Sequence, residues 1–326
     1  MVLKEQSLIN QSSLEEFLLM DFSDVRELQL LHFMVFLVWY LVAATGNLLI
    51  ISAVAWDHHL HTPMYFFLIN LAIQDIGQIS VIIPKSIFNY LLNTRHISYF
   101  GCVAQVLLFV FFLASDFSLL TVMAYDRYVA ICNPLQYEKV MNKQACIHMV
   151  IVVWIFSFFY GVLHTGGTFA SPFCSNVINQ FFCEIPQLLK LACSDLYLIE
   201  IGVLSFSATV GLGCFVFIVV TYVHIFNAVL KIPSVQGRQK AFSTCLPHLI
   251  VVSVFLSTGY FAYLKPTSTS PSHLGLALTM MYSMVPPLMN PVIYSMRNKE
   301  IKHALSKLLG LRYSPWNTFS ILGLQR

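Results

Sequence analysis

Charged residues are scarce in this chain of 326 residues. Lys and Arg number 18 and Asp and Glu 15, so that 10% of the chain is charged, against roughly 25% in typical soluble domains. Hydrophobic residues make up 57%. A soluble domain of this composition would have too little polar surface. The net charge of +3 is small and the basic residues are dispersed, which does not indicate a nucleic-acid partner.

Other features are missing as well. The sequence contains no glycine-rich nucleotide loop, no zinc-like spacing of Cys and His, and no repeat of fixed period. Residues 1–27 carry six acidic and two basic residues, which is unlike a signal peptide. The first apolar segment is therefore expected to direct membrane insertion itself.

Seven long runs carry almost no charge. They cover residues 28–56, 64–84 (interrupted by Asp75), 99–125 (interrupted by Asp116), a run within 145–166, 201–230, 241–264 and 273–296. Each is close to or above the roughly 20 residues that a helix needs to cross the hydrocarbon. The sequence therefore predicts an all-α membrane protein, with a seven-transmembrane helix bundle over residues 28–297.

The basic residues predict the orientation of this bundle. With the N-terminus outside, twelve Lys and Arg residues fall on the inner side and six on or near the outer side. Because inner loops carry an excess of basic residues, we expect a multi-pass plasma-membrane protein with an extracellular N-terminus and a cytoplasmic C-terminus. Residues 1–27 are then an extracellular tail, in which Asn10-Gln11-Ser12 is an acceptor for N-glycosylation.

Residues 298–326 are expected to be cytoplasmic. Their apolar positions form one helical stripe, namely Ile301, Ala304, Leu305, Leu308 and Leu309. This stripe predicts a short amphipathic helix along the inner membrane face. A frayed helical tail is the alternative.

Four of the eight cysteines fall on the outer side, where disulfides persist. They are Cys102, Cys174, Cys183 and Cys193. Two bridges have three connectivities, which spacing alone does not separate. The remaining four, Cys132, Cys146, Cys214 and Cys245, are expected to be reduced.

Asp126 and Arg127 follow the third apolar run directly. Because Arg keeps its charge at this depth, it needs a carboxylate partner or water. We expect an ion pair that acts as a latch, closed in one state and open in another. The alternative is an ion pair that only marks the membrane boundary.

Five blocks of sequence resemble those of the olfactory receptors, a branch of the rhodopsin-like G-protein-coupled receptors. They are Gly46-Asn47, residues 60–68 (LHTPMYFFL), 123–132 (MAYDRYVAIC), 240–245 (KAFSTC) and 287–298 (PLMNPVIYSMRN). The blocks occur in the family's order along the chain. The chain departs from the usual pattern at Pro247, at residues 255–257 (FLS), at Thr221 and at Asp116, and the first two departures concern the shape of the ligand pocket.

This resemblance implies a receptor that is not an enzyme, has no catalytic residues and needs no cofactor. The implied partners are a small volatile odorant, membrane lipid and a heterotrimeric G protein of the stimulatory, olfactory class, which raises cyclic AMP. The residues implied in coupling and switching are Asp126, Arg127, Tyr128, Tyr222, Asn290, Pro291 and Tyr294. The implied disulfides are Cys102–Cys183 and Cys174–Cys193, which would make the loop before span five a lid.

The ligand pocket is expected in the outer half of the bundle, among helices three, five, six and seven. Its predicted residues are Phe109, Val110, Leu113, Ala114, Glu184, Ile185, Phe206, Ser207, Val210, Leu256, Gly259, Tyr260, Tyr263, Met280 and Ser283. Such a pocket suits a small, mostly apolar molecule with one polar group, held by Ser207, Tyr260 or Ser283. The alternative is that each residue only packs between helices. An opsin is excluded because residues 266–296 contain no Lys for a Schiff base.

Asp75 and Asp116 are costly inside the bilayer, so each should face the bundle interior. By the resemblance, they form a polar core with Asn47 and Asn290. The hypothesis is that this core binds Na+ as an allosteric ion or shares a proton, and that it changes when the receptor switches. A static hydrogen-bonded cluster is the alternative, and no other metal is expected.

Two other classes of function remain open on these residues. A membrane transporter or channel also places carboxylates at mid-depth, but it is typically built from paired broken helices in two halves. A chemosensory receptor for a non-odorant metabolite outside the nose would share every motif described above.

Overall fold

A computed structural model describes residues 15–20, 25–193, 197–263, 273–297 and 299–310. The predicted glycosylation site at Asn10 and the C-terminal residues 311–326 lie outside the described residues.

The described chain is almost entirely helical. Its elements are β1 (Glu16–Leu19), α1 (Arg26–Trp56), η2 (His58–Leu60), α2 (Pro63–Leu92), β2 (His96–Ser98), α3 (Tyr99–Cys132), η3 (Pro134–Gln136), α4 (Tyr137–Val140), α5 (Lys143–Phe169), β3 (Val177–Ile178), α6 (Ile185–Leu191), α7 (Tyr197–Leu230), α8 (Val235–Tyr263), α9 (His273–Arg297) and α10 (Lys299–Leu308).

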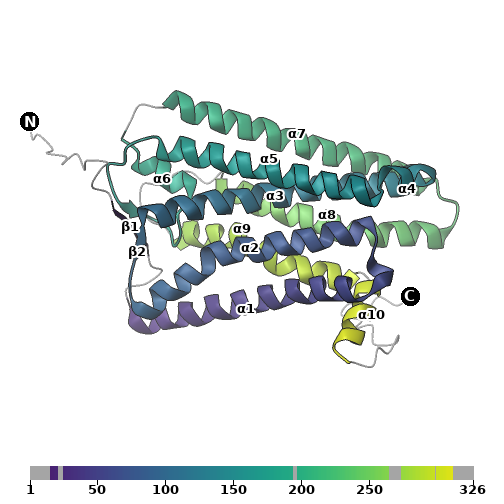
Figure 1. The fold of residues 1–326 in the computed structure, drawn as a ribbon, viewed down its shortest axis with the longest axis horizontal. Helices are drawn as coiled ribbons and strands as arrows, with labels where there is room; N and C mark the ends of the chain where they lie inside the picture. Colours follow the sequence, from purple (N-terminus) through teal and green to yellow (C-terminus); the bar gives the residue numbers. More distant parts are fainter. Residues whose placement is uncertain (1–14, 21–24, 194–196, 264–272, 298, 311–326) are drawn as a thin grey trace, which may run out of the picture.

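The long helices α1, α2, α3, α5, α7, α8 and α9 run side by side in one bundle (Figure 1). Within the described residues, six of them, all except α9, are long and apolar enough to cross a membrane. The predicted seven-helix membrane bundle is thereby confirmed. Helix α3 is its central member, since it packs against α2, α5, α7 and α8. We call the end that carries the strands the sheet end and the opposite end the α10 end.

The helices are longer than the charge-free runs. Helix α2 continues through Pro84 to Leu92, and α3 continues past Asp126 and Arg127 to Cys132. A proline removes only one backbone donor, and a charge does not break a helix whose other face is buried. Capping residues therefore define the first residue of a helix better than charged residues do. At the start of α3, for example, the Ser98 hydroxyl accepts a hydrogen bond from the backbone N–H of Gly101 at 3.1 Å.

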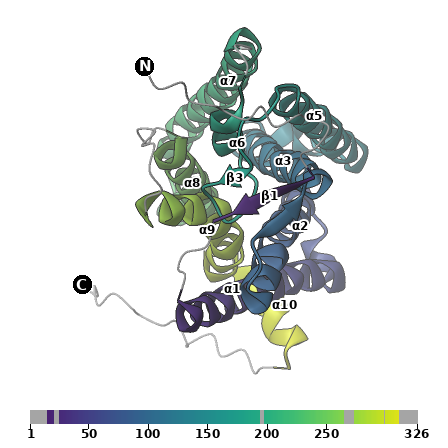
Figure 2. The same ribbon diagram turned by 90° about the vertical axis from the view of Figure 1, so that its left-hand side faces the viewer.

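A small sheet of order β2-β1-β3 crosses the end of the bundle, as Figure 2 shows. Strand β1 pairs antiparallel with β2, where Phe17 lies opposite Ile97, and parallel with β3, where Leu18 lies opposite Val177. The Phe17 side chain is fully buried and stacks on Tyr99. Residues 16–19 belong to the segment that is expected to be an extracellular tail, and the structure packs them into the sheet end.

Helix α10 follows α9 and packs against α1 and α9. Ile301 and Ala304 are buried, whereas Lys302 and Lys307 are exposed. The Tyr65 hydroxyl of α2 donates to a carboxylate oxygen of Glu300. The apolar side of the helix and this hydrogen bond thus help to hold it to the bundle.

Candidate functional site

A cavity of about 480 Å³ lies inside the bundle, and α3, α5 and α7 provide most of its wall. Ile185 of α6, Phe255 of α8 and Tyr282 of α9 complete it. Its lining residues are Val110, Leu113, Ala114, Phe117, Ser118, Phe156, Tyr160, His164, Ile185, Ser207, Ala208, Val210, Gly211, Cys214, Phe255 and Tyr282. The volume is within the usual range for small-molecule pockets, about 300–1,000 Å³.

The structure brings six of the predicted pocket residues into this wall. They are Val110, Leu113, Ala114, Ile185, Ser207 and Val210. They come from α3, α6 and α7. These six predicted residues thus line one common cavity, and their role in ligand binding stays a prediction.

Six other predicted residues lie elsewhere. Phe109 packs edge-on against Phe182 and Tyr282, and Phe206 is exposed on α7. Glu184, Leu256, Met280 and Ser283 do not line the cavity either. The Ser283 side chain is fully buried, and its hydroxyl donates to the backbone carbonyl of Thr279 at 2.7 Å. Gly259, Tyr260 and Tyr263 belong to α8, and the structure does not describe what surrounds them.

The wall formed by α5 was not predicted. It consists of Phe156, Tyr160 and His164, which are spaced by four residues and so lie on one face of the helix. This face reaches the cavity because α5 lies close to α3. A Cβ atom added to Gly161 would be only 3.0 Å from the backbone carbonyl oxygen of Leu107. The regular spacing of aromatic and imidazole side chains was the available indication in the sequence.

One corner of the cavity is polar. Nε2 of His164 lies 2.7 Å from Oγ of Ser207, and the Ser207 hydroxyl also donates to the carbonyl of Val203 at 2.8 Å. The tautomer of His164 decides which of the two atoms is the donor in this bond, and the Tyr160 hydroxyl also interacts with Ser207. The imidazole ring of His164 also lies 4.4 Å from the Tyr160 ring, measured between centroids.

The loop between α5 and α7 covers the cavity from the sheet end. Disulfides join Cys102 to Cys183 and Cys174 to Cys193, as the resemblance implied. The backbone N–H of Cys183 donates to the side-chain oxygen of Gln105 at 2.8 Å. Tyr282, which lines the cavity, donates its hydroxyl to the Glu184 carboxylate. Glu184 therefore links the loop to the cavity wall without lining it.

The predicted ion pair between Asp126 and Arg127 is not formed within the described chain. The Asp126 carboxylate instead accepts from the Tyr137 hydroxyl at 2.8 Å. Burial of the hydroxyl and, after it, the charge of Asp126 raise the pKa of Tyr137. The prediction failed because Tyr137 of α4 folds back onto α3 and takes the carboxylate as its acceptor. Arg127 is 5% exposed, and its Nε has no hydrogen-bond partner in the described residues.

Two hydrogen bonds connect α7, α8 and α3 beside Arg127. Nε2 of His248 lies 2.9 Å from the backbone carbonyl of Leu120, so this nitrogen is the donor. Nδ1 of His248 then accepts from the Tyr222 hydroxyl at 2.7 Å. Tyr222 was predicted as a switch residue. His248 was noted only as part of a motif, and its bridging position was missed.

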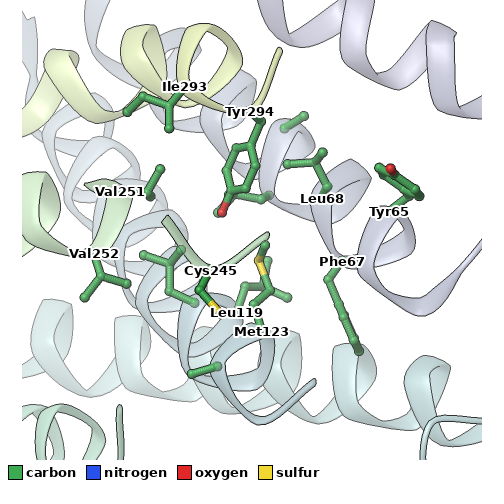
Figure 3. Close-up of a cluster of buried hydrophobic side chains, with 14 of the residues drawn as sticks. Tyr65, Phe67, Leu68, Leu119, Met123, Cys245, Val251, Val252, Ile293 and Tyr294 are labelled. Atoms are coloured by element: carbon green, nitrogen blue, oxygen red, sulfur yellow. The ribbon is translucent and has the colours of Figure 1, made fainter. Parts of the chain in front are cut away.

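Of the remaining predicted switch residues, Tyr294 lies near these bonds, since it interacts electrostatically with Tyr222. Figure 3 shows Tyr294 among buried side chains that include Leu68, Met123 and Cys245. The Tyr294 hydroxyl has no hydrogen-bond partner in the described residues. A Cβ atom added to Gly46 would lie 3.1 Å from Cβ of Pro291, so α1 and α9 are close there. Tyr128 lies apart from this group, with its half-buried ring edge-on to His224.

The polar residues of the expected core are all buried. Nδ2 of Asn290 donates to both carboxylate oxygens of Asp75, at 3.1 and 3.0 Å. Nδ2 of Asn47 donates to the backbone carbonyls of Ala43 and Pro287, both at 3.0 Å. Asp116 has one carboxylate oxygen without a partner in the described residues. No group of three or more His, Cys, Asp or Glu residues that could hold a metal ion occurs in the described chain.

Comparisons with known proteins agree with this geometry. A family model described as "Olfactory receptor" matches residues 36–312. The chain is 50% identical to olfactory receptor 14C36 of Homo sapiens, over 92% of this chain and 96% of that protein. It is 48% identical to olfactory receptor 14A16 of Homo sapiens, over 92% and 97%.

More distant proteins share the fold. The chain is 43% identical to olfactory receptor 1G1 of Gorilla gorilla gorilla, over 93% of this chain and 97% of that one. The crystal structure of squid rhodopsin superposes with a TM-score of 0.68 at 18% identity, over 88% of this chain and 82% of that chain. The chain therefore belongs to the olfactory receptor family and has the fold of rhodopsin, and it is a receptor and not an enzyme.

Proposed function

We propose that this receptor binds small, volatile, mostly apolar odorants in the cavity between α3, α5 and α7. The observation that carries this proposal is the cavity itself, which lies between helices of the bundle and is lined mainly by apolar and aromatic side chains. Such linings favour uncharged ligands with large apolar surfaces. The olfactory names of the relatives support the odorant class.

The sheet end is extracellular in this proposal, and the α10 end is cytoplasmic. The excess of basic residues on the inner side supports this orientation. The two disulfides lie at the sheet end, where an oxidising compartment keeps them formed. The receptor then resides in the plasma membrane, with α10 along the inner membrane face.

Odorant binding favours the state in which the α10 end of α8 moves outward. In that movement His248 leaves the Leu120 carbonyl, because these two groups belong to α8 and α3. Arg127, Tyr222 and Tyr294 then line a cytoplasmic opening. A heterotrimeric G protein of the stimulatory, olfactory class docks there and raises cyclic AMP. Arg127 is nearly buried and its Nε lacks a hydrogen-bond partner within the described residues, which supports its role as the cation that contacts the partner.

The polar core has a separate proposed role in switching. Asp75 and Asp116 are buried, and one oxygen of Asp116 lacks a partner in the described residues. Two carboxylates in one buried region are stabilised by a cation or by a shared proton. We assign Na+ or a proton to this position, held by Asp75 and Asp116. A response to odorant that does not change with Na+ concentration or with Asp75→Asn would contradict this role.

A cyclic AMP reporter in cells that express the receptor tests the function. A diverse panel of volatile compounds is applied, and cell-surface receptor is quantified in parallel. We expect at least one volatile to raise cyclic AMP, and we expect Arg127→Ala to abolish the response at equal surface expression. A response that survives this substitution, or solute flux without a G protein, would contradict the proposal.

A further inference from the structure

A second cavity, of about 440 Å³, lies between α1, α2 and the start of α5. We call it the α2–α5 groove. It is at the α10 end of the bundle, where the neighbouring Tyr65 bonds to Glu300 of α10. The floor of the groove is buried and includes Val54, Leu60 and Cys146. None of the residues proposed for odorant binding or coupling lines this groove, so the proposed function leaves it unexplained.

The lining changes from polar to apolar along the helices. His61, Thr62 and Lys143 lie at or just before the first residues of α2 and α5, and all three are exposed. Phe66 and Ile69, further along α2, contribute an aromatic ring and an aliphatic chain. Ile69 follows Thr62 by seven residues, which is about 10 Å along a helix. Because these helices cross the membrane, the polar rim lies near the membrane surface and the apolar part lies within the hydrocarbon. This gradient matches an amphiphile that lies parallel to the helices.

The rim favours a negatively charged head group. Lys143 lines the groove, whereas no Asp or Glu of the described residues does so. Lys143 also forms no ion pair within the described chain. Helix α5 begins at Lys143 and α2 begins at Pro63, so the positive ends of two helix dipoles add to this charge. The Thr62 hydroxyl makes no capping bond with α2 and can donate to a phosphate oxygen.

We propose that the α2–α5 groove binds one anionic phospholipid from the membrane leaflet at the α10 end. Its phosphate lies against Lys143 and Thr62, and one acyl chain lies along Phe66 and Ile69. A sterol or a zwitterionic phospholipid fills the apolar part equally well but leaves the charge of Lys143 without a counter-ion. In the proposed orientation this leaflet is cytoplasmic, and cytoplasmic leaflets carry the anionic lipids. The inference needs neither an odorant nor a G protein.

The bound lipid should also stabilise the bundle. It contacts α2 and α5 at once, and these two helices are packed mainly through α3, which lies between them. A molecule that binds the folded receptor and not the unfolded chain raises the stability of the fold. Lipid binding and the midpoint of thermal unfolding are therefore two independent measurements of the same site.

The experiment uses the purified full-length receptor, stripped of lipid in detergent micelles. The probes are phosphatidylserine, phosphatidylcholine with the same acyl chains, cholesterol, and glycerophosphoserine, which carries the head group without the chains. Native mass spectrometry measures the affinity of the first bound molecule, and thermal unfolding measures the stabilisation.

Two pairs of variants isolate the charge and the apolar part of the groove. Lys143→Gln removes the charge and Lys143→Arg keeps it. Lys231→Gln is the matched control, because Lys231 is exposed at the end of α7 and does not line the groove. Ile147→Trp fills the apolar part with a larger side chain. Ile151→Trp is its control, since Ile151 is exposed one turn further along α5 and lies outside the lining.

Phosphatidylserine should bind about fivefold more tightly than phosphatidylcholine, which is the usual effect of one Lys beside anionic lipid. It should also raise the unfolding midpoint more. Lys143→Gln should bring the two affinities close to equality, whereas Lys143→Arg and Lys231→Gln should retain the preference. Ile147→Trp should weaken the binding of both phospholipids and Ile151→Trp should not. Glycerophosphoserine should not compete with phosphatidylserine.

Four results would overturn the inference. Equal affinities of the native receptor for the two phospholipids would show that the rim selects no charge. A preference that survives Lys143→Gln, or that Lys231→Gln removes to the same extent, would show a general effect of surface charge. Cholesterol that binds more tightly than phosphatidylserine, and is lost with Ile147→Trp, would make the groove a sterol site. Competition by glycerophosphoserine would show an anion site without a lipid chain. If Ile147→Trp does not fold, the Lys143 variants decide the question, because this side chain is exposed. All four results leave the proposed odorant function standing.

Discussion

The Tyr222 hydroxyl donates to Nδ1 of His248 across 2.7 Å, and this bond ties α7 to α8 at a fully buried position. Nε2 of the same imidazole donates to the Leu120 carbonyl, so that one side chain joins three helices. A neutral histidine with one donor and one acceptor satisfies both partners only in this tautomer. The position of α8 relative to α3 therefore depends on His248.

Tyr222→Phe should destabilise the receptor through this bond. The substitution keeps the ring but leaves Nδ1 of His248 buried without a donor, which costs about 1–3 kcal/mol. We expect a lower midpoint of thermal unfolding for the purified receptor. Tyr128→Phe is the matched control, because Tyr128 is half-buried and its described contact is an edge-on ring contact with His224. Equal losses for the two variants would show that the bond to His248 contributes nothing.

Asp126 and Tyr137 should behave as a coupled pair. Their hydrogen bond is charge-assisted, and such bonds contribute about 1.5–3 kcal/mol. In a double-mutant cycle with Asp126→Asn and Tyr137→Phe, the two losses of unfolding free energy should therefore be strongly non-additive. Simple additivity would mean that the contact has no energetic weight.

The pH dependence of the Tyr137 contribution has a definite sign. The pKa of Tyr137 is raised in the folded receptor, so folding favours the protonated hydroxyl. Its contribution is then fully present below the unfolded pKa of about 10 and is lost as the pH rises through the folded pKa. The stability difference between the native receptor and Tyr137→Phe should be constant from about pH 6 to 9. A difference that shrinks within this range would contradict the raised pKa.

The bundle could be predicted from the sequence because lipid imposes a simple rule. Every crossing segment must be apolar over a fixed length, so the charge-free runs located the seven helices. The limits of the runs were less reliable. Lys85 and Arg127 interrupt the apolar pattern, but α2 and α3 continue past both as regular helices.

The features that were missed depend on contacts between distant segments. Strand β1 (Glu16–Leu19) forms because it pairs with β2 and β3, which lie about 80 and 160 residues further along the chain. The sequence of four residues does not by itself predict this pairing. The α5 wall of the cavity depends on how closely α5 approaches α3. The bond from Tyr137 to Asp126 likewise depends on a turn that brings α4 back to α3.

Phe17→Ala tests whether β1 is part of the folded receptor. The Phe17 ring is fully buried against Tyr99 and Phe173, and removing a buried Phe side chain costs about 3–5 kcal/mol. We expect a clearly lower unfolding midpoint and less receptor at the cell surface. Phe100→Ala is the matched control, since Phe100 is 82% exposed. An unchanged midpoint for Phe17→Ala would mean that β1 does not contribute to the fold.

Two glycines of α5 should respond to the same substitution with opposite signs. In Gly161→Ala the new Cβ would lie 3.0 Å from the Leu107 carbonyl oxygen, so the helices must separate, which costs about 1–3 kcal/mol. In Gly166→Ala the new Cβ meets no atom within 4 Å, and the lower backbone entropy of the unfolded chain should stabilise the helix by about 0.5–1 kcal/mol. Thermal unfolding of the two variants measures both changes. Because α5 forms one wall of the cavity, Gly161→Ala should also weaken ligand binding, whereas Gly166→Ala should leave it unchanged. Equal shifts of the same sign would show that the close approach of α5 to α3 at Gly161 does not constrain the packing.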